Sequence, residues 1–238
     1  MNAFLYGAFL QWKLDIRSKS LLISCYAVPL VFFGVMGGIF TAVMPDARDT
    51  LIQSMTVFGV TMGALIGVPP SLVEIYGSDI RKAYRANGVP LSLGLALTGV
   101  SAFVHLFLMS GILYLAAPLA FGAAVPENPG GYFIGLAVVI AASLGVAGAI
   151  GLAVKDPSKT PMVSILLFLP SILFSGILFP AELLPGAFAA AGRAFPATWG
   201  YRLLCENPPR LETALPLLAI FLLTGCVCAA LLHRMKTE

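Results

Sequence analysis

Long apolar runs alternate with short polar segments along the chain. Because the hydrocarbon core of a bilayer is about 30 Å thick and a helix rises about 1.5 Å per residue, a spanning helix needs about 20 apolar residues. Two prolines, Pro69 and Pro70, fall within one run and are expected to bend or end its helix. The pattern predicts an all-α integral membrane protein with six transmembrane helices, near residues 21–42, 51–73, 91–117, 132–154, 161–180 and 213–232.

The first 20 residues have an amphipathic pattern, with aromatic residues at helical spacing and basic residues toward the far end. Such a segment lies along the membrane interface, its apolar side in lipid and its basic side at the headgroups. A cleaved signal peptide is the competing interpretation, but the apolar run that follows is long enough to span. We expect an interfacial helix at 1–20 and a single six-span domain at 21–238. The residues expected at the interface are Phe9, Trp12, Lys13 and Arg17.

Residues 181–212, between the fifth and sixth runs, are moderately apolar and rich in prolines and small residues. This segment is too broken for a spanning helix and too apolar for a plain loop. Short helices that enter the membrane and return would fit, provided that protein shields their backbone polar groups. We therefore expect re-entrant extracellular helices before the last span.

Three glycines in the second run, Gly59, Gly63 and Gly67, recur four residues apart. Small residues at this spacing allow two helix backbones to approach closely, which favours association in lipid. The spacing predicts close helix packing, either inside the subunit or against a second copy.

Composition supports the membrane interpretation, since 59% of the 238 residues are hydrophobic and only 11% are charged. A soluble domain carries about 25% charged residues. If the N-terminus lies inside, ten Lys and Arg residues fall on cytoplasmic segments and four on the opposite side, which satisfies the positive-inside rule. We expect a multi-pass protein of a bacterial inner membrane with both termini in the cytoplasm.

The sequence contains none of the common catalytic motifs: G-x-x-x-x-G-K-[ST], H-E-x-x-H and G-x-S-x-G are all absent. We therefore expect no catalytic residue, cofactor or metal in this chain. His105, inside the third run, is interpreted as a packed, hydrogen-bonded histidine, with a proton-handling role as the alternative. The cysteines lack the spacing of metal ligands: Cys25, Cys205, Cys226 and Cys228.

The segment EIYGSDIRKAYRANGVP, residues 74–90, predicts a short basic helix between the second and third spans. Ser78 is a plausible N-cap, and Gly88–Pro90 provides a stop. The positive-inside rule alone explains the basic residues. It does not explain Ile80 and Tyr84, an apolar pair four residues apart that suits docking into a groove of a partner protein.

Three stretches together resemble the membrane subunit of ABC-2 type transporters: FLQWKLDIRSKS, EIYGSDIRKAYRANGVPLS and SGILFPAELLPGAFAAAGRAFPATWGYRLL. The resemblance implies a second permease subunit, the same or homologous, and two cytoplasmic ATPase subunits that bind ATP and Mg²⁺. It also implies that the basic helix is a coupling helix that sits in a cleft of the ATPase, with the amphipathic helix beside it. The candidate coupling residues are Glu74, Gly77, Ser78, Asp79, Ile80, Arg81, Lys82, Tyr84 and Arg85.

The function implied is ATP-driven export of an apolar or amphipathic substrate, such as a drug, lipid, peptide or glycan, with no nucleic acid partner. Two other classes stay open: a transporter driven by an ion gradient, and a membrane anchor or sensing partner of an ATPase that transports nothing. An ion-coupled transporter usually places carboxylates deep within its spans, and this sequence has none there. That difference favours the exporter.

Overall fold

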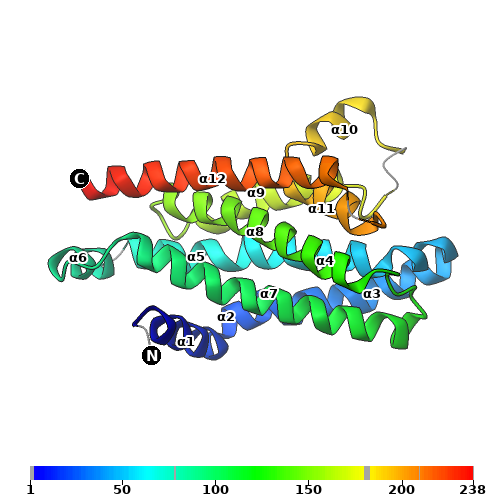
Figure 1. The fold of residues 1–238 in the computed structure, drawn as a ribbon, viewed down its shortest axis with the longest axis horizontal. Helices are drawn as coiled ribbons and strands as arrows, with labels where there is room; N and C mark the ends of the chain where they lie inside the picture. The colour runs from blue at the N-terminus through cyan, green and yellow to red at the C-terminus, as the bar shows by residue number, and fades with distance from the viewer. Residues whose placement is uncertain (1–2, 78, 180–182, 209, 238) are drawn as a thin grey trace.

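The computed structural model describes residues 3–77, 79–179, 183–208 and 210–237, and these residues form helices and no strands (Figure 1). Most helices run along the long axis of the molecule, side by side, as expected of a membrane bundle. The prediction of an all-α membrane fold is therefore confirmed. Helix is the favoured spanning structure because it satisfies every backbone polar group within one segment, where lipid offers no partner.

The chain enters through α1 (Ala3–Arg17), which is separate from the first span. A second short helix, α2 (Lys19–Leu22), leads into a π-helical segment, η1 (Ile23–Ala27), and then into α3 (Val28–Val43). The apolar part of this first span covers Ile23–Val43. The 3₁₀ helix η2 (Pro45–Asp49) follows at the opposite end of the bundle.

The second span is the central helix of the bundle and the most deeply buried of the candidate spans. It combines α4 (Leu51–Met62), the π-helical η3 (Gly63–Gly67) and α5 (Val68–Gly77). Its two prolines were expected to bend or end the helix, and they do not end it, because the helix continues past them to Gly77. The π-helical turn directly before the prolines changes the hydrogen-bond pattern where a proline would otherwise disrupt it.

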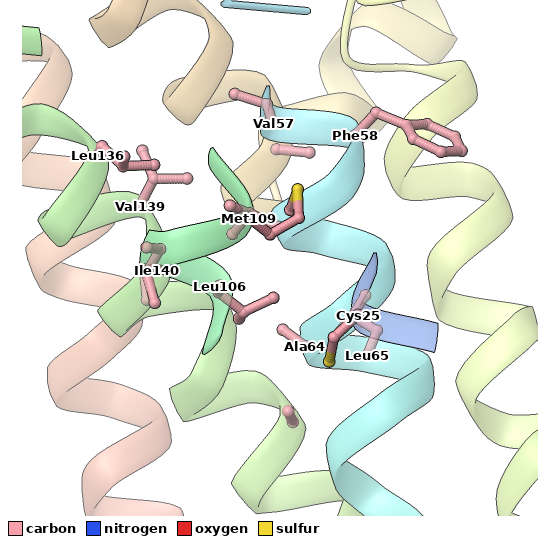
Figure 2. Close-up of a cluster of buried hydrophobic side chains, with 14 of the residues drawn as sticks. Cys25, Val57, Phe58, Ala64, Leu65, Leu106, Met109, Leu136, Val139 and Ile140 are labelled. Carbon is pink, nitrogen blue, oxygen red and sulfur yellow. The ribbon is translucent and has the colours of Figure 1, made fainter. Parts of the chain in front are cut away.

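The glycines of this helix pack inside the subunit. A Cβ atom added to Gly59 would lie 2.6 Å from Met109 Cε, and one added to Gly63 would overlap the Leu106 side chain. Figure 2 shows both of these α7 side chains between the central helix and α8. Of the two interpretations of the glycine spacing, internal packing is confirmed for these positions.

The remaining long helices are α7 (Ser92–Phe121), α8 (Pro129–Ala153) and α12 (Leu211–Thr237). Together with the first two spans they give five helices, among the described residues, that are long and apolar enough to cross a membrane. The apolar α9 (Thr160–Leu173) has 14 residues and is about 21 Å long.

The predicted fifth span therefore ends earlier than residue 180. The chain turns directly after α9, where the Ser175 hydroxyl donates to the Ile172 carbonyl at 2.7 Å and Gly176 adopts a φ of 86°. Only a residue without a Cβ adopts that backbone conformation readily. The count of six spans stays a prediction, since α9 is shorter than a full crossing of the hydrocarbon core.

Two short helices, α10 (Gly186–Gly192) and α11 (Pro196–Cys205), occupy the predicted re-entrant segment. The Thr198 hydroxyl donates to the Gly192 carbonyl at 2.6 Å, and the Trp199 indole N–H donates to the Arg193 carbonyl at 2.8 Å. Side chains of α11 thus satisfy the carbonyls at the end of α10. This arrangement supplies the internal hydrogen bonds that irregular backbone near a membrane needs.

The two ends of the bundle differ in what they carry. Both chain termini lie at the end that also holds α6 (Asp79–Ala86), whereas α10 and α11 lie at the other end (Figure 1). This placement agrees with the prediction that both termini face the same side. That this side is the cytoplasm stays a prediction.

Candidate functional site

The helix α6 lies between the predicted N-cap and the predicted stop at Gly88–Pro90, whereas the first four residues of the 74–90 segment belong to α5. Its end has the hydrogen bonds of a Schellman motif: the Val89 N–H donates to the Tyr84 carbonyl at 2.9 Å, and the Gly88 N–H donates to the Arg85 carbonyl at 3.3 Å. Gly88 has a φ of 66°, which explains why glycine ends the helix here. The predicted N-cap, Ser78, lies outside the described residues.

A buried tyrosine fastens the helices on both sides of α6. The Tyr76 hydroxyl, near the end of α5, donates to the Leu91 carbonyl at 2.5 Å and accepts the Leu95 N–H at 2.8 Å. The absence of a side chain at Gly94 leaves room for this contact, since a Cβ there would lie 3.2 Å from the Tyr76 oxygen and 3.1 Å from Ile75 Cγ2. α6 is therefore held between two helices that are joined to each other.

The candidate coupling residues divide into an outward set and an inward set. Arg81 and Tyr84 are half-buried, and Arg81 lines a small cavity of about 160 Å³ beside Lys155. The Asp79 backbone begins the helix. The exposed members of the set are Glu74, Gly77, Ile80, Lys82 and Arg85.

The far end of α6 contacts the last helix of the chain. An Arg85 guanidinium N–H donates to the Lys236 carbonyl at 3.3 Å. Near this contact a cavity of about 590 Å³ is lined by residues of α6, of α12 and of the turn before α7, among them Pro90 and His233. One continuous surface at this end of the bundle thus combines α6 with the C-terminal turns of α12. We call this the basic end surface.

The loop between α8 and α9 also lies at this end. The Asp156 carboxylate accepts hydrogen bonds from the Ser158 hydroxyl at 2.7 Å and from the Ser158 N–H at 3.0 Å. These hydrogen bonds, more than the exposed Lys159 ammonium at 3.7 Å, hold the pKa of Asp156 below its ordinary value. The carboxylate therefore stays charged at neutral pH, and it lies between two lysines of the same loop, Lys155 and Lys159.

The four residues predicted to lie at the membrane interface belong to α1. Phe9, Lys13 and Arg17 are exposed, and Trp12 is half-buried. The main packing partners of α1 are α7 and α2. Asp15, which lies between Lys13 and Arg17 in the sequence, is only 5% exposed and faces α7.

No metal centre is evident in the part of the chain that the structure describes, where no three His, Cys, Asp or Glu side chains gather. Cys25 and Cys228 are buried between helices, and no described cysteine forms a disulfide. What this surface offers is a basic, partly apolar helix, α6, held between two helices that are joined to each other.

These features define a multi-pass membrane protein with an exposed basic helix at the end of the bundle that holds both termini. Residues 5–207, most of the chain, match the family model of the ABC-2 type transporter. The chain belongs to this family of transport permeases, which confirms the resemblance found in the sequence. A comparison with curated proteins finds no match.

Proposed function

We propose that this chain is the membrane-spanning subunit of an ATP-driven exporter in a bacterial inner membrane. Two such subunits, identical or homologous, pair in the membrane, and two cytoplasmic ATPase subunits bind ATP and Mg²⁺. Membership of the ABC-2 type transporter family supports a permease role. The observation that carries the proposal is the exposed basic α6, held on a rigid support at one end of the bundle.

The composition of α6 suits a docking partner with an acidic, partly apolar cleft. Arg81, Lys82 and Arg85 place three positive charges on eight residues, and the Ile80 side chain is 44% exposed. Complementary charges speed the encounter of two proteins and select the partner, while a central apolar residue contributes affinity. The acidic cleft is assigned to the ATPase.

The position of α6 also provides a path for motion into the membrane. α5 is the part of the central helix nearest to α6, so a displacement of α6 acts on the buried core. Within that helix, η3 is a π-helical segment, a kind of irregularity that often marks functional sites in helices. Closure of the ATPase pair would shift α6, and the central helix would transmit this shift past Gly63 toward the far end of the bundle.

An apolar or amphipathic substrate is supported by the cavity at that far end. It has a volume of about 860 Å³ and lies between the end of α3, η2 and α11. Phe40, Met44 and Tyr201 give it apolar walls, and Asp46 and Arg202 add charged groups. Such a lining suits a molecule with an apolar body and a polar group. This cavity is the proposed outlet for a drug, lipid, peptide or glycan.

Reversing the charge of α6 tests the proposal. In the Arg81→Glu/Arg85→Glu variant, we expect the ATPase to dissociate from the permease and ATP-dependent transport to fall at least about tenfold, because like charges repel across the contact. The matched control is Arg193→Glu/Arg210→Glu, which makes the same charge change on exposed residues at the other end. Equal ATPase association in both variants and in the wild type would refute the coupling role of α6.

A further inference from the structure

A cluster of polar side chains joins the interfacial helix to the third span. Asp15, on α1, has only 5% of its surface exposed, and both of its carboxylate oxygens accept hydrogen bonds. The Ser101 hydroxyl of α7 donates to Asp15 Oδ2 at 2.5 Å, and the Gln11 amide donates to Oδ1 at 2.9 Å. The short Ser101–Asp15 bond links residues that are 86 positions apart in the chain.

One turn further along α7, His105 extends the cluster to the first span. Its Nδ1 atom lies 2.8 Å from the Tyr26 hydroxyl of η1, and the Trp12 ring of α1 stacks on the imidazole with a centroid distance of 6.2 Å. His105 is 2% exposed. The expectation of a packed, hydrogen-bonded histidine is thus met by its surroundings. Three segments, α1, η1 and α7, meet at this point.

The cluster gives α1 a defined position, which its apolar side chains do not provide. Phe4, Leu5 and Phe9 are between 44% and 58% exposed, and exposed apolar side chains of this kind would bind a lipid surface equally well at many places. A buried carboxylate is costly unless hydrogen bonds compensate for the lost water. Asp15 therefore stabilises the one placement of α1 in which Ser101 reaches it.

The attachment point on α7 is close to the support of α6. Ser101 follows the first residue of α7, Ser92, by nine residues, or about 14 Å along the helix. Tyr76 binds the same stretch of α7 through the Leu95 N–H. Both α1 and α5, the helix that leads into α6, are thus attached to the first turns of α7, by different side chains.

We propose that Asp15 is a positioning residue: with Ser101 and the stacked pair of Trp12 and His105 it forms a polar latch that fixes α1 to α7, so that α1 and α6 move as one unit. The attachment of α1 to α7 involves residues of this chain alone. The shared movement rests on the proposed function, since the force on α6 is assigned to the ATPase.

The fastening is tested on the permease alone, in lipid nanodiscs. A Gly7→Cys/Leu97→Cys pair, in a background with the four native cysteines replaced by alanine, reports contact between α1 and α7, because a Cβ at Gly7 would lie 3.4 Å from the Leu97 side chain. The yield of a short thiol cross-linker is then compared among latch variants. Folding of each variant is checked by its elution from a sizing column.

Asp15→Ala should lower the cross-linking yield at least about fivefold, because it leaves Ser101 and Gln11 without their shared acceptor. Ser101→Ala should have a similar effect. Asp15→Asn retains an oxygen and an amide that reach Ser101 and should restore most of the yield. The control, Leu14→Ala, removes an exposed side chain of the same helix and should change nothing. An unchanged yield in both Asp15→Ala and Ser101→Ala would overturn the latch.

The shared movement is tested in the complete complex with its ATPase. Asp15→Ala should keep the ATPase bound but lower the number of substrate molecules moved per ATP hydrolysed, and Asp15→Asn should rescue that ratio. The α6 charge-reversal variant distinguishes the coupling role of α6 from the attachment of α1 to α7. It should lose ATPase binding and keep the wild-type cross-linking yield, because its latch residues are unchanged. If Asp15→Ala lowers cross-linking and leaves the ratio at the wild-type value, the positioning role is refuted.

Discussion

Tyr76→Phe removes a single oxygen atom and isolates the contribution of the two hydrogen bonds that join α5 to the start of α7. The aromatic ring stays in its site, so no large cavity forms. The hydroxyl makes two hydrogen bonds, one to the Leu91 carbonyl and one from the Leu95 N–H, and Tyr76 is 4% exposed. A buried group left without its partner costs about 1–3 kcal/mol. We therefore expect the first turn of α7 to open about fivefold to 150-fold more often than in the wild type.

Amide hydrogen exchange over residues 91–97 measures this opening directly, since local unfolding exposes the amide hydrogens to exchange. The matched control is Tyr6→Phe, which removes the same atom from a tyrosine that is 55% exposed. In the complex, Tyr76→Phe should also lower the stimulation of ATP hydrolysis by substrate. Exchange at the wild-type rate in Tyr76→Phe would refute the claim that this hydroxyl holds the start of α7.

Two further predictions concern α10 and the loop between α8 and α9. Gly192→Ala should lower the midpoint of thermal unfolding by several degrees, because its Cβ would overlap the Phe174 carbonyl, whereas Gly186→Ala, with open space around it, should not. Ser158→Ala should raise the pKa of Asp156 toward the ordinary value of an aspartate, as measured by carboxyl NMR. Since the folded pKa is depressed, the loop is stabilised above about pH 4 and loses this stabilisation as the pH falls further. Between pH 6 and 8 this stabilisation is fully present, so Ser158→Ala should lower the stability there by a constant amount, and the difference from the wild type should shrink as the pH falls below about 4.

Much of this fold follows from the hydropathy pattern. Four of the long spans lie within a few residues of their predicted positions, because a run of about 20 apolar residues has few alternatives to a spanning helix. The end of α6 was also predictable, since Gly88 supplies the left-handed conformation that a Schellman motif needs. These features depend on local sequence alone.

Features that depend on tertiary contacts were missed. The π-helical turn of η3 kept the second span intact, and the hydrogen bonds of Ser175 ended α9 early. The burial of Asp15 was not predicted, because its partner Ser101 is distant in the chain. The only available signal was its acidic charge among basic neighbours. Tyr76 gave no signal, because its two partners come from the next helix.

The measurement that tests the account most directly is gentle purification of the tagged chain from its native membrane, with quantification of every protein that copurifies. The account predicts an ABC-type ATPase at an equal molar ratio to the permease, two copies of each, and ATP hydrolysis that the complex couples to transport. Recovery of the chain without any ATPase under several gentle conditions, together with transport that follows an ion gradient, would contradict it.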